Sequence, residues 1–160
     1  MADPLEELYE QYKKPVYNFL CAMCRNRSVA EELTHDTFIK AFKGLKSYRG
    51  EASLKTWLFR IARNTYLNNV KKASTRYELS FADPEREAAG SYENADVQMA
   101  VTETLLQLSE QERTLLTLRS HGFSIAEMAV VLGLTEGNIK VGLHRAKKKF
   151  RKLYFDGEVT

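Results

Sequence analysis

Residues 124–150, SIAEMAVVLGLTEGNIKVGLHRAKKKF, decide the fold of the C-terminal part of the chain. Ser124 and Glu127 have the spacing of a capping box, in which each side chain binds a free backbone N–H at the start of a helix. We expect this short helix to end at Gly133 and Thr135 to cap a longer helix. Apolar residues recur at helical spacing in the longer helix, at Ile139, Leu143, Ala146 and Phe150. Two helices joined by a short turn that contains glycine are the pattern of a helix-turn-helix.

The outward face of the longer helix is strongly basic. Between residues 140 and 152 there is no acidic side chain, and the basic ones are Lys140, Arg145, Lys147, Lys148, Lys149, Arg151 and Lys152. An α-helix fits the major groove of DNA, and a basic face neutralises the phosphates there. We therefore expect this helix to bind DNA with an affinity that falls steeply as salt rises. A basic helix that binds an acidic protein or a membrane surface is the alternative, and the capped preceding helix argues against the membrane.

The N-terminal half also predicts helices, and strand-like alternation of apolar and polar residues is rare. An apolar stripe covers residues 5–23, with a kink or a helix restart expected at Pro15. A capping box at Ser28 and Glu31 predicts the start of a second helix. A third helix is expected over residues 53–72, after a break that contains glycine. The predicted fold class is therefore all-α.

Two further helices are expected ahead of the helix-turn-helix. The first is predicted over residues 97–108. The second begins at another capping box, formed by Ser109 and Glu112, and ends at His121 and Gly122.

Charge and composition divide the chain into two small helical domains. Residues 40–76 contain ten Lys or Arg against one acid, whereas residues 77–98 contain six acids against one base. The acidic stretch also holds Pro, Gly and several Ser and Ala, so it cannot bury much surface. We predict a first domain over residues 1–73, a flexible acidic linker over 74–97 and a second domain over 98–160. Two basic blocks separated in this way suggest two sites for a polyanion, with two solvated faces as the alternative.

Several other function classes find no support in the sequence. No apolar run approaches the ~18 residues that span a membrane, and the N-terminus lacks the pattern of a secretory signal, so we expect a cytoplasmic protein without direct membrane insertion. Cys21 and Cys24 form a lone C-x-x-C in an apolar helical stretch, which favours buried structural cysteines over a metal site or thiol switch. No catalytic group of residues, phosphate loop or ligand cluster is visible, so we expect no enzyme, no metal and no cofactor.

Two long stretches together resemble a known family. Residues 30–68, AEELTHDTFIKAFKGLKSYRGEASLKTWLFRIARNTYLN, are similar to the second conserved region of RNA polymerase sigma factors of the extracytoplasmic-function group. Residues 108–153, LSEQERTLLTLRSHGFSIAEMAVVLGLTEGNIKVGLHRAKKKFRKL, are similar to the fourth. The resemblance implies an alternative sigma factor that binds core RNA polymerase, recognises the −35 and −10 promoter elements and promotes transcription initiation. It also implies an anti-sigma factor as a partner.

The resemblance assigns the binding of core polymerase to Glu32, His35 and Asp36. The two carboxylates would make charge-assisted contacts with basic groups of the polymerase. The family often has Gln where this chain has His35. Glu32 and His35 also fit the E-x-x-H motif of di-iron proteins, but such a site needs two of these motifs and two further Glu, and this chain has only one such motif.

The resemblance places the −10 element on residues 47–53 and on the helix that follows. In the family this loop captures a base flipped out of the opened DNA. An aromatic ring and small polar groups can hold such a base, while basic side chains follow the backbone. The predicted −10 residues are Tyr48, Arg49, Ser53, Arg60, Arg63 and Asn64. Trp57 is ambiguous, and its helical spacing with Leu54, Leu58 and Ile61 favours the core over DNA.

The residues implied for the −35 element are Lys140, Val141, His144, Arg145 and Lys148. The family commonly has a small polar residue and Arg where this chain has Val141 and Gly142. Glycine costs a helix about 1 kcal/mol relative to alanine, and we interpret Gly142 as the loss of a DNA contact. Val141 can instead touch the methyl group of a thymine.

Two other functions remain open from the sequence. A helix-turn-helix transcriptional regulator would act without being a polymerase subunit, usually as a dimer that reads paired half-sites. An interaction protein would use its basic helices to bind an acidic partner. Tight binding to a palindromic duplex without polymerase identifies the regulator, and a lack of salt-dependent DNA binding identifies the interaction protein.

Overall fold

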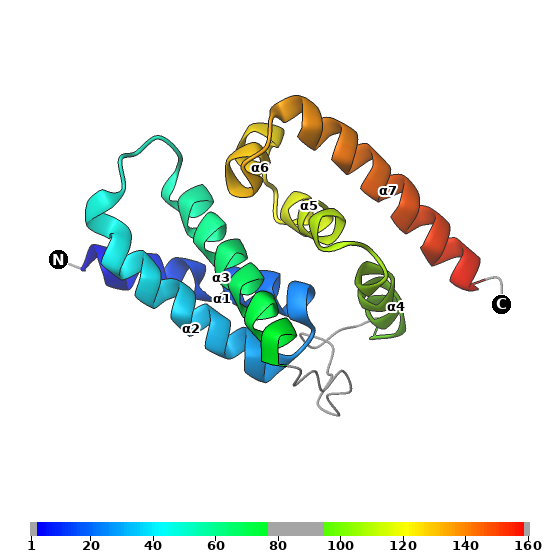
Figure 1. Cartoon of the computed structure of the whole chain (residues 1–160), viewed down its shortest axis with the longest axis horizontal. Coiled ribbons are helices and arrows are strands. Elements are labelled where there is room, and N and C mark those ends of the chain that lie inside the picture. Colours follow the sequence, from blue (N-terminus) through cyan, green and yellow to red (C-terminus); the bar gives the residue numbers. More distant parts are fainter. Residues whose placement is uncertain (1–2, 77–94, 159–160) are drawn as a thin grey trace. The chain divides into compact units, whose positions relative to one another are not determined.

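The structure, a computed structural model, describes residues 3–76 and 95–158. Within these two ranges every regular element is a helix and no strand occurs (Figure 1). The predicted all-α fold class is confirmed. The chain divides into two compact units, one that contains residues 3–76 and one that contains residues 95–158.

The N-terminal unit is built from three helices. They are α1 (Pro4–Cys24), α2 (Arg27–Gly44) and α3 (Leu54–Arg76), and the short 3₁₀ helix η1 (Leu45–Ser47) follows α2. Each of the three α-helices packs against the other two (Figure 1). α1 continues through Pro15 as a single helix, so the restart that we considered there does not occur.

Aromatic rings form much of the core of this unit. Phe19 of α1 contacts Phe59 of α3 with ring centroids 5.5 Å apart, and both side chains are fully buried. Phe38 of α2 is also buried and meets the ring of Tyr9 edge-on at 5.0 Å. Such edge-to-face pairs add stabilisation beyond the burial of their area. Because the core joins all three helices, it fixes which faces of α2 and α3 are exposed to solvent.

The start of α2 differs from the prediction. Asn26, not Ser28, is the N-cap, and its Oδ1 accepts a hydrogen bond of 3.0 Å from the N–H of Val29. Asn is as good an N-cap as Ser. α1 ends at Cys24, and its C-cap Arg25, with a left-handed φ of 51°, stands immediately before Asn26. The capping box that we expected at Ser28 and Glu31 is therefore wrong.

The helices on both sides of the predicted linker extend into its expected range. α3 reaches Arg76, and α4, the first helix of the C-terminal unit, covers Ala95–Leu106 instead of residues 97–108. Both ends of the predicted linker, residues 74–97, are therefore helical. The amino-acid composition of the linker indicated where the buried core ends, but the backbone hydrogen bonds of a helix can continue beyond the core. Its residues 77–94 lie outside the described residues.

The C-terminal unit contains the predicted helix-turn-helix. After α4 come α5 (Glu110–Ser120), α6 (Ile125–Leu132) and α7 (Glu136–Glu158), and α7 packs against each of the other three helices. Gly133 ends α6 with a φ of 70°. Thr135 caps α7, as predicted, by accepting a hydrogen bond of 3.1 Å from the N–H of Asn138.

Both capping boxes predicted in this unit are confirmed. The hydroxyl of Ser109 accepts from the N–H of Glu112 at 3.2 Å, while the Glu112 carboxylate accepts from the N–H of Ser109 at 2.9 Å. Ser124 and Glu127 repeat the arrangement at 3.1 and 2.8 Å. Each box satisfies two backbone N–H groups that a helix start leaves without a partner.

Gly142 lies where α7 packs against α5. A Cβ placed on Gly142 would be 3.0 Å from Cδ1 of Leu115, a buried residue of α5, so a side chain there would force a neighbour to move. The missing side chain lets the two helices approach closely. This corrects our interpretation of Gly142 as a lost DNA contact, because the position faces α5.

Replacing Gly142 with valine should destabilise the C-terminal unit by about 1–3 kcal/mol, because it overfills the contact with Leu115. Thermal unfolding followed by circular dichroism measures this change. Gly137→Ala is the control, since a Cβ there meets only Oγ1 of Thr135 at 4.0 Å and alanine should raise helix stability by up to about 1 kcal/mol. If Gly142→Val is as stable as the wild type, the packing of α7 on α5 is not as described.

Candidate nucleic-acid interfaces

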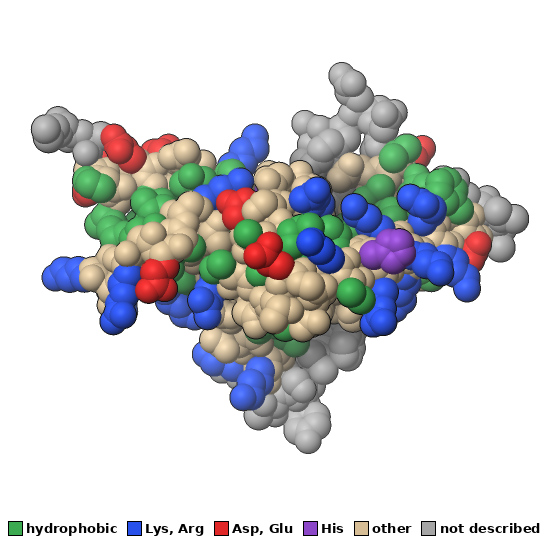
Figure 2. All heavy atoms as spheres, turned by 90° about the horizontal axis from the view of Figure 1, so that it is seen from above, with side chains coloured by type: hydrophobic (Ala, Val, Ile, Leu, Met, Phe, Trp, Pro, Cys, Tyr) green, Lys and Arg blue, Asp and Glu red, His purple; other side chains and the backbone are tan. Residues whose placement is uncertain are grey.

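α7 separates an apolar face from a cationic one. Ile139, Leu143 and Ala146 are buried in the core of the C-terminal unit. The predicted −35 residues are all exposed, namely Lys140, Val141, His144, Arg145 and Lys148. Figure 2 shows Lys and Arg side chains gathered over this helix. The structure therefore presents the predicted set together on one open surface.

Lys149 has a different role from the other basic residues of α7. Its Nζ lies 3.2 Å from a carboxylate oxygen of Glu112 on α5. Burial raises the pKa of Glu112, but the hydrogen bonds from Ser109 and the ammonium group of Lys149 outweigh it, and the net pKa is lowered. The ion pair ties α7 to the capping box of α5.

The turn before α7 exposes the first residues of that helix. The N–H of Leu134 donates to the carbonyl of Ala129 at 3.0 Å, which closes the end of α6. Gly137 and Asn138 follow in the first turn of α7 and are exposed. The N-terminal residues of a recognition helix are those that reach base edges. The sequence prediction did not include Asn138, although its position three residues before Val141 places it on the same face.

A hydrogen bond and a ring contact shape the loop between η1 and α3. The hydroxyl of Tyr48 donates to the carbonyl of Ala52, and the ring of Tyr48 lies 5.2 Å from that of Trp57. Gly50 has a φ of 75°, in a region that favours glycine. Arg49, which stands between Tyr48 and Gly50 in the sequence, is exposed. The loop therefore carries a basic side chain beside an ordered aromatic pair.

Two residues of this region also support the fold. Ser53 is exposed, but its Oγ accepts a hydrogen bond of 3.1 Å from the N–H of Thr56 at the start of α3. Trp57 is half-buried rather than fully in the core. A Cβ on Gly44 would lie 3.5 Å from its ring, so the tryptophan packs over a residue without a side chain.

The exposed stripe of α3 is polar and basic. Arg60 and Asn64 are exposed, and Asn68 continues the same line one turn further on. Lys40 of α2 lies beside the stripe, with its Nζ 3.4 Å from Oγ1 of Thr65. The sequence prediction did not include Asn68 and Lys40 in this surface. The four-residue spacing of the two asparagines was a signal for the first, whereas only the packing of α2 on α3 places the second.

Arg63 departs from the prediction. Its side chain is 9% exposed, so it does not belong to the open stripe. It shares a face of α3 with Phe59 and Tyr66, which are both buried, at helical spacing. The charge of Arg63 suggested DNA, but its position on the helix directs it inward, where it contributes to the fold.

The predicted polymerase-binding residues lie on α2. Glu32 and His35 are exposed and Asp36 is half-exposed. Glu32 and Asp36 share a face, because they are four residues apart. These three side chains give α2 an outward surface with two carboxylates.

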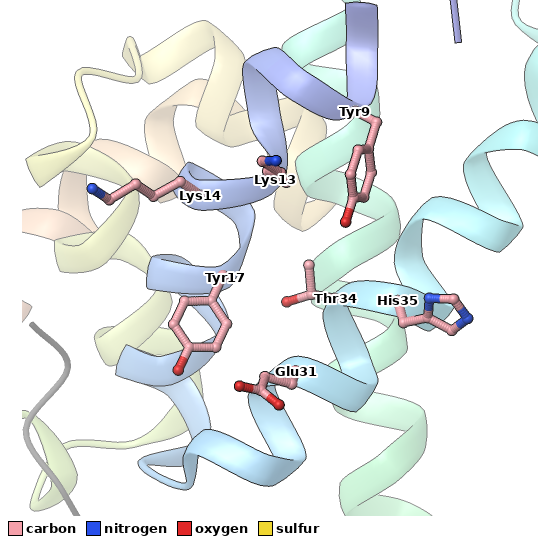
Figure 3. A pocket seen from close by; sticks show the side chains of 7 residues that line it. All are labelled: Tyr9, Lys13, Lys14, Tyr17, Glu31, Thr34 and His35. Atoms are coloured by element: carbon pink, nitrogen blue, oxygen red, sulfur yellow. The ribbon is translucent and has the colours of Figure 1, made fainter. Parts of the chain in front are cut away.

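A cleft of about 420 Å³ opens between α1 and α2, and His35 belongs to it. Its lining consists of Tyr9, Lys13, Lys14, Tyr17, Glu31, Thr34 and His35 (Figure 3). Burial and a hydrogen bond with Cys21 raise the pKa of Tyr17 to about 12. Its hydroxyl therefore keeps its proton at physiological pH.

Comparisons with known proteins identify the family. The Sigma-70 region 2 model matches residues 8–76, and the Sigma-70, region 4 model matches residues 98–150. The RNA polymerase sigma factor YlaC of Bacillus subtilis (strain 168) is 30% identical over 162 residues, which cover 94% of this chain and 91% of YlaC. The ECF RNA polymerase sigma factor SigM of the same organism is 29% identical and covers 96% of each chain. The chain belongs to the extracytoplasmic-function (ECF) group of sigma-70 factors.

Solved structures show the same fold as this ECF sigma factor. The sigma factor RpoE in complex with the anti-sigma factor NepR, from Bartonella quintana, is 24% identical with a TM-score of 0.75, over 92% of this chain and 94% of RpoE. CnrH, solved with the cytosolic domain of CnrY, is 21% identical with a TM-score of 0.71, over 93% of this chain and 86% of CnrH. As an ECF sigma factor, the chain binds core RNA polymerase, recognises promoter DNA and promotes transcription initiation. Sigma factors as a family are not enzymes.

The two cysteines of the sigma factor are free thiols. Cys21 is buried and Cys24 is half-buried, and the Sγ–H of Cys24 donates to the carbonyl of Leu20 at 2.9 Å. Burial raises the pKa of the Cys21 thiol, which makes it a poor nucleophile. Within residues 3–76 and 95–158, no three His, Cys, Asp or Glu side chains gather in a way that suits a metal ion. No described helix is both long and apolar enough to span a bilayer.

Proposed function

We propose that this sigma factor reads the −35 element as duplex DNA with the exposed face of α7. The supporting observation is the set of exposed side chains Lys140, Val141, His144, Arg145 and Lys148 on a helix whose other face is buried in its unit. A helix of this kind fits the major groove. Basic side chains along it neutralise phosphates, so binding weakens by orders of magnitude between low and physiological salt if about six phosphates are contacted.

The opened −10 element occupies the loop after η1 and the exposed stripe of α3. The aromatic pair of Tyr48 and Trp57 offers a surface next to which an unstacked base can lie. Arg49 and Arg60 neutralise the backbone of the single strand, and Asn64 binds base edges. Arg63 is left out of this set because it is buried, and Ser53 acts chiefly as the cap of α3.

Core RNA polymerase binds the outward face of α2 through Glu32, His35 and Asp36. Two carboxylates on one face suit a basic surface of the polymerase, and the neighbouring cleft between α1 and α2 extends the contact area. An anti-sigma factor is a further partner, since RpoE and CnrH, which share the fold, were each solved with a partner. The protein acts in the cytoplasm, where RNA polymerase is found. It needs no cofactor and no catalytic group, because the polymerase carries out the chemistry.

Transcription by core polymerase over a fragmented genomic library tests this function. With the protein added, we expect a new set of start sites that share two sequence elements upstream. A set of start sites that does not change when the protein is added would refute the proposal. Tight binding to a palindromic duplex without polymerase would instead identify an independent transcriptional regulator.

Replacing Asn64 with alanine should lower promoter opening while polymerase binding is retained. An asparagine contact to a base edge is worth about 1–3 kcal/mol, so opening should fall about fivefold or more, measured by permanganate reactivity of unpaired thymines. Asn18→Ala, on an exposed position of α1, is the control and should leave opening unchanged. Loss of polymerase binding in Asn64→Ala would show that this asparagine has a different role.

A further inference from the structure

One exposed aliphatic side chain interrupts the cationic face of α7. Val141 is 50% exposed and is surrounded in sequence by the exposed residues Lys140, His144 and Arg145. In the part of α7 whose side chains are described, the other large apolar residue with this exposure is Phe155, at the far end of the helix. Valine is a weaker helix former than Lys or Arg because its branched side chain loses freedom. Neither helix stability nor the core of the unit therefore explains Val141.

Val141 lies near the N-terminal end of α7, a position that suits contact with bases. It lies in the second turn of α7, and the N-terminal turns of a recognition helix contact base edges. Side chains of a helix tilt toward its N-terminus, so Val141 leans over Gly137, one turn earlier. Gly137 has no side chain, and a Cβ placed there would meet only Oγ1 of Thr135, at 4.0 Å. On the side of Gly137, Val141 is therefore open to a group that approaches the start of the helix.

The apolar side chain of Val141 suits contact with one kind of group in the major groove. The C5 methyl of thymine is the apolar group that base pairs display in the major groove, and their other groups there are hydrogen-bond donors and acceptors. Valine offers no hydrogen bond, so a donor or acceptor covered by it loses its water without a replacement. A methyl group loses nothing and gains contact.

We propose that Val141 specifies a thymine at one position of the −35 element by contact with its C5 methyl. The inference rests on the proposed function, in which α7 reads that element. It gives the side chain a base preference that the neighbouring Lys and Arg do not share, since they bind guanine edges or phosphates.

Deoxyuridine substitution tests the contact, because it removes this methyl group alone. Promoter templates come from the start sites mapped with core polymerase, and each thymine of the −35 element is replaced in turn. Competition binding of the full chain with core polymerase is measured on each template. At one position we expect deoxyuridine to weaken wild-type binding about fourfold, the effect of burying one methyl group. With Val141→Ser the same replacement should have no effect.

Val97→Ser is the matched control, because the side chain of Val97 is exposed to the same extent, 51%, but belongs to α4 and not to α7. It should respond to deoxyuridine like the wild type. If the wild type binds its promoters but no deoxyuridine changes its affinity, or if Val141→Ser keeps the wild-type response, the inference is wrong and the proposed function stands. If the wild type with polymerase binds no promoter, the proposed function fails and the inference fails with it.

Discussion

The double variant Arg145→Glu and Lys148→Glu should lose transcription from −35-dependent promoters by at least about a hundredfold. Both side chains are exposed on the cationic face of α7, three residues apart. A contact of arginine with a base is worth about 1–3 kcal/mol, and each phosphate contact adds less. Reversal of the charge also introduces repulsion from the phosphates. Start-site sequencing with core polymerase gives the measurement, and a shallower salt dependence of binding is expected alongside it.

The matched control for this variant is Arg151→Glu with Lys152→Glu. It makes the same charge change on the same helix, at exposed positions beyond the region 4 match, which ends at residue 150. The control should retain most of the activity. Equal loss in both variants would mean that net charge, and not the face formed by Arg145 and Lys148, drives binding.

Asp36→Arg should strongly weaken the binding of core polymerase. The carboxylate lies half-exposed on α2 and shares a face with Glu32. Removal of one partner from a buried, charged contact costs about 2–5 kcal/mol, and arginine adds repulsion from a basic surface. We expect affinity for core polymerase to fall at least about thirtyfold in a pull-down or by surface plasmon resonance.

Asp96→Arg is the control for the change of charge, because Asp96 is exposed on α4 in the other unit. It should bind polymerase like the wild type. The isolated −35 duplex, tested at low salt, should bind Asp36→Arg as it binds the wild type, because α7 belongs to the other unit. An unaffected pull-down of core polymerase by Asp36→Arg would remove α2 from the polymerase interface.

Prediction of the helices succeeded where a signal was local and unopposed. Ser109, Ser124 and Thr135 each stand before an apolar run, with no competing cap nearby, and all three cap helices in the structure. Ser28 failed because Asn26, two residues earlier, caps equally well and begins the helix sooner. A capping signal therefore predicts that a helix starts, but neighbouring caps decide at which residue.

The exposure of the predicted site residues agrees with the structure on α7 and departs from it on α3. On α7 the basic residues fall opposite the buried Ile139, Leu143 and Ala146, so the spacing indicated that they are exposed, whereas Val141 was assigned to this face by the family resemblance. On α3 the faces are mixed, and a charged residue, Arg63, points into the unit. The stem of an arginine is long and apolar enough to be buried when its guanidinium group finds partners, so charge by itself did not reveal its direction.

The sequence by itself determined the helical class of the chain, the caps of the C-terminal helices and the cationic face of α7. All three depend on residues a few positions apart, whose geometry a helix fixes. Tertiary structure alone decided that Gly142 allows α7 to approach Leu115, that Tyr48 packs on Trp57, and that Lys40 of α2 lies beside α3. These features join residues that are distant in sequence or held by a loop, and their distances depend on how the helices pack.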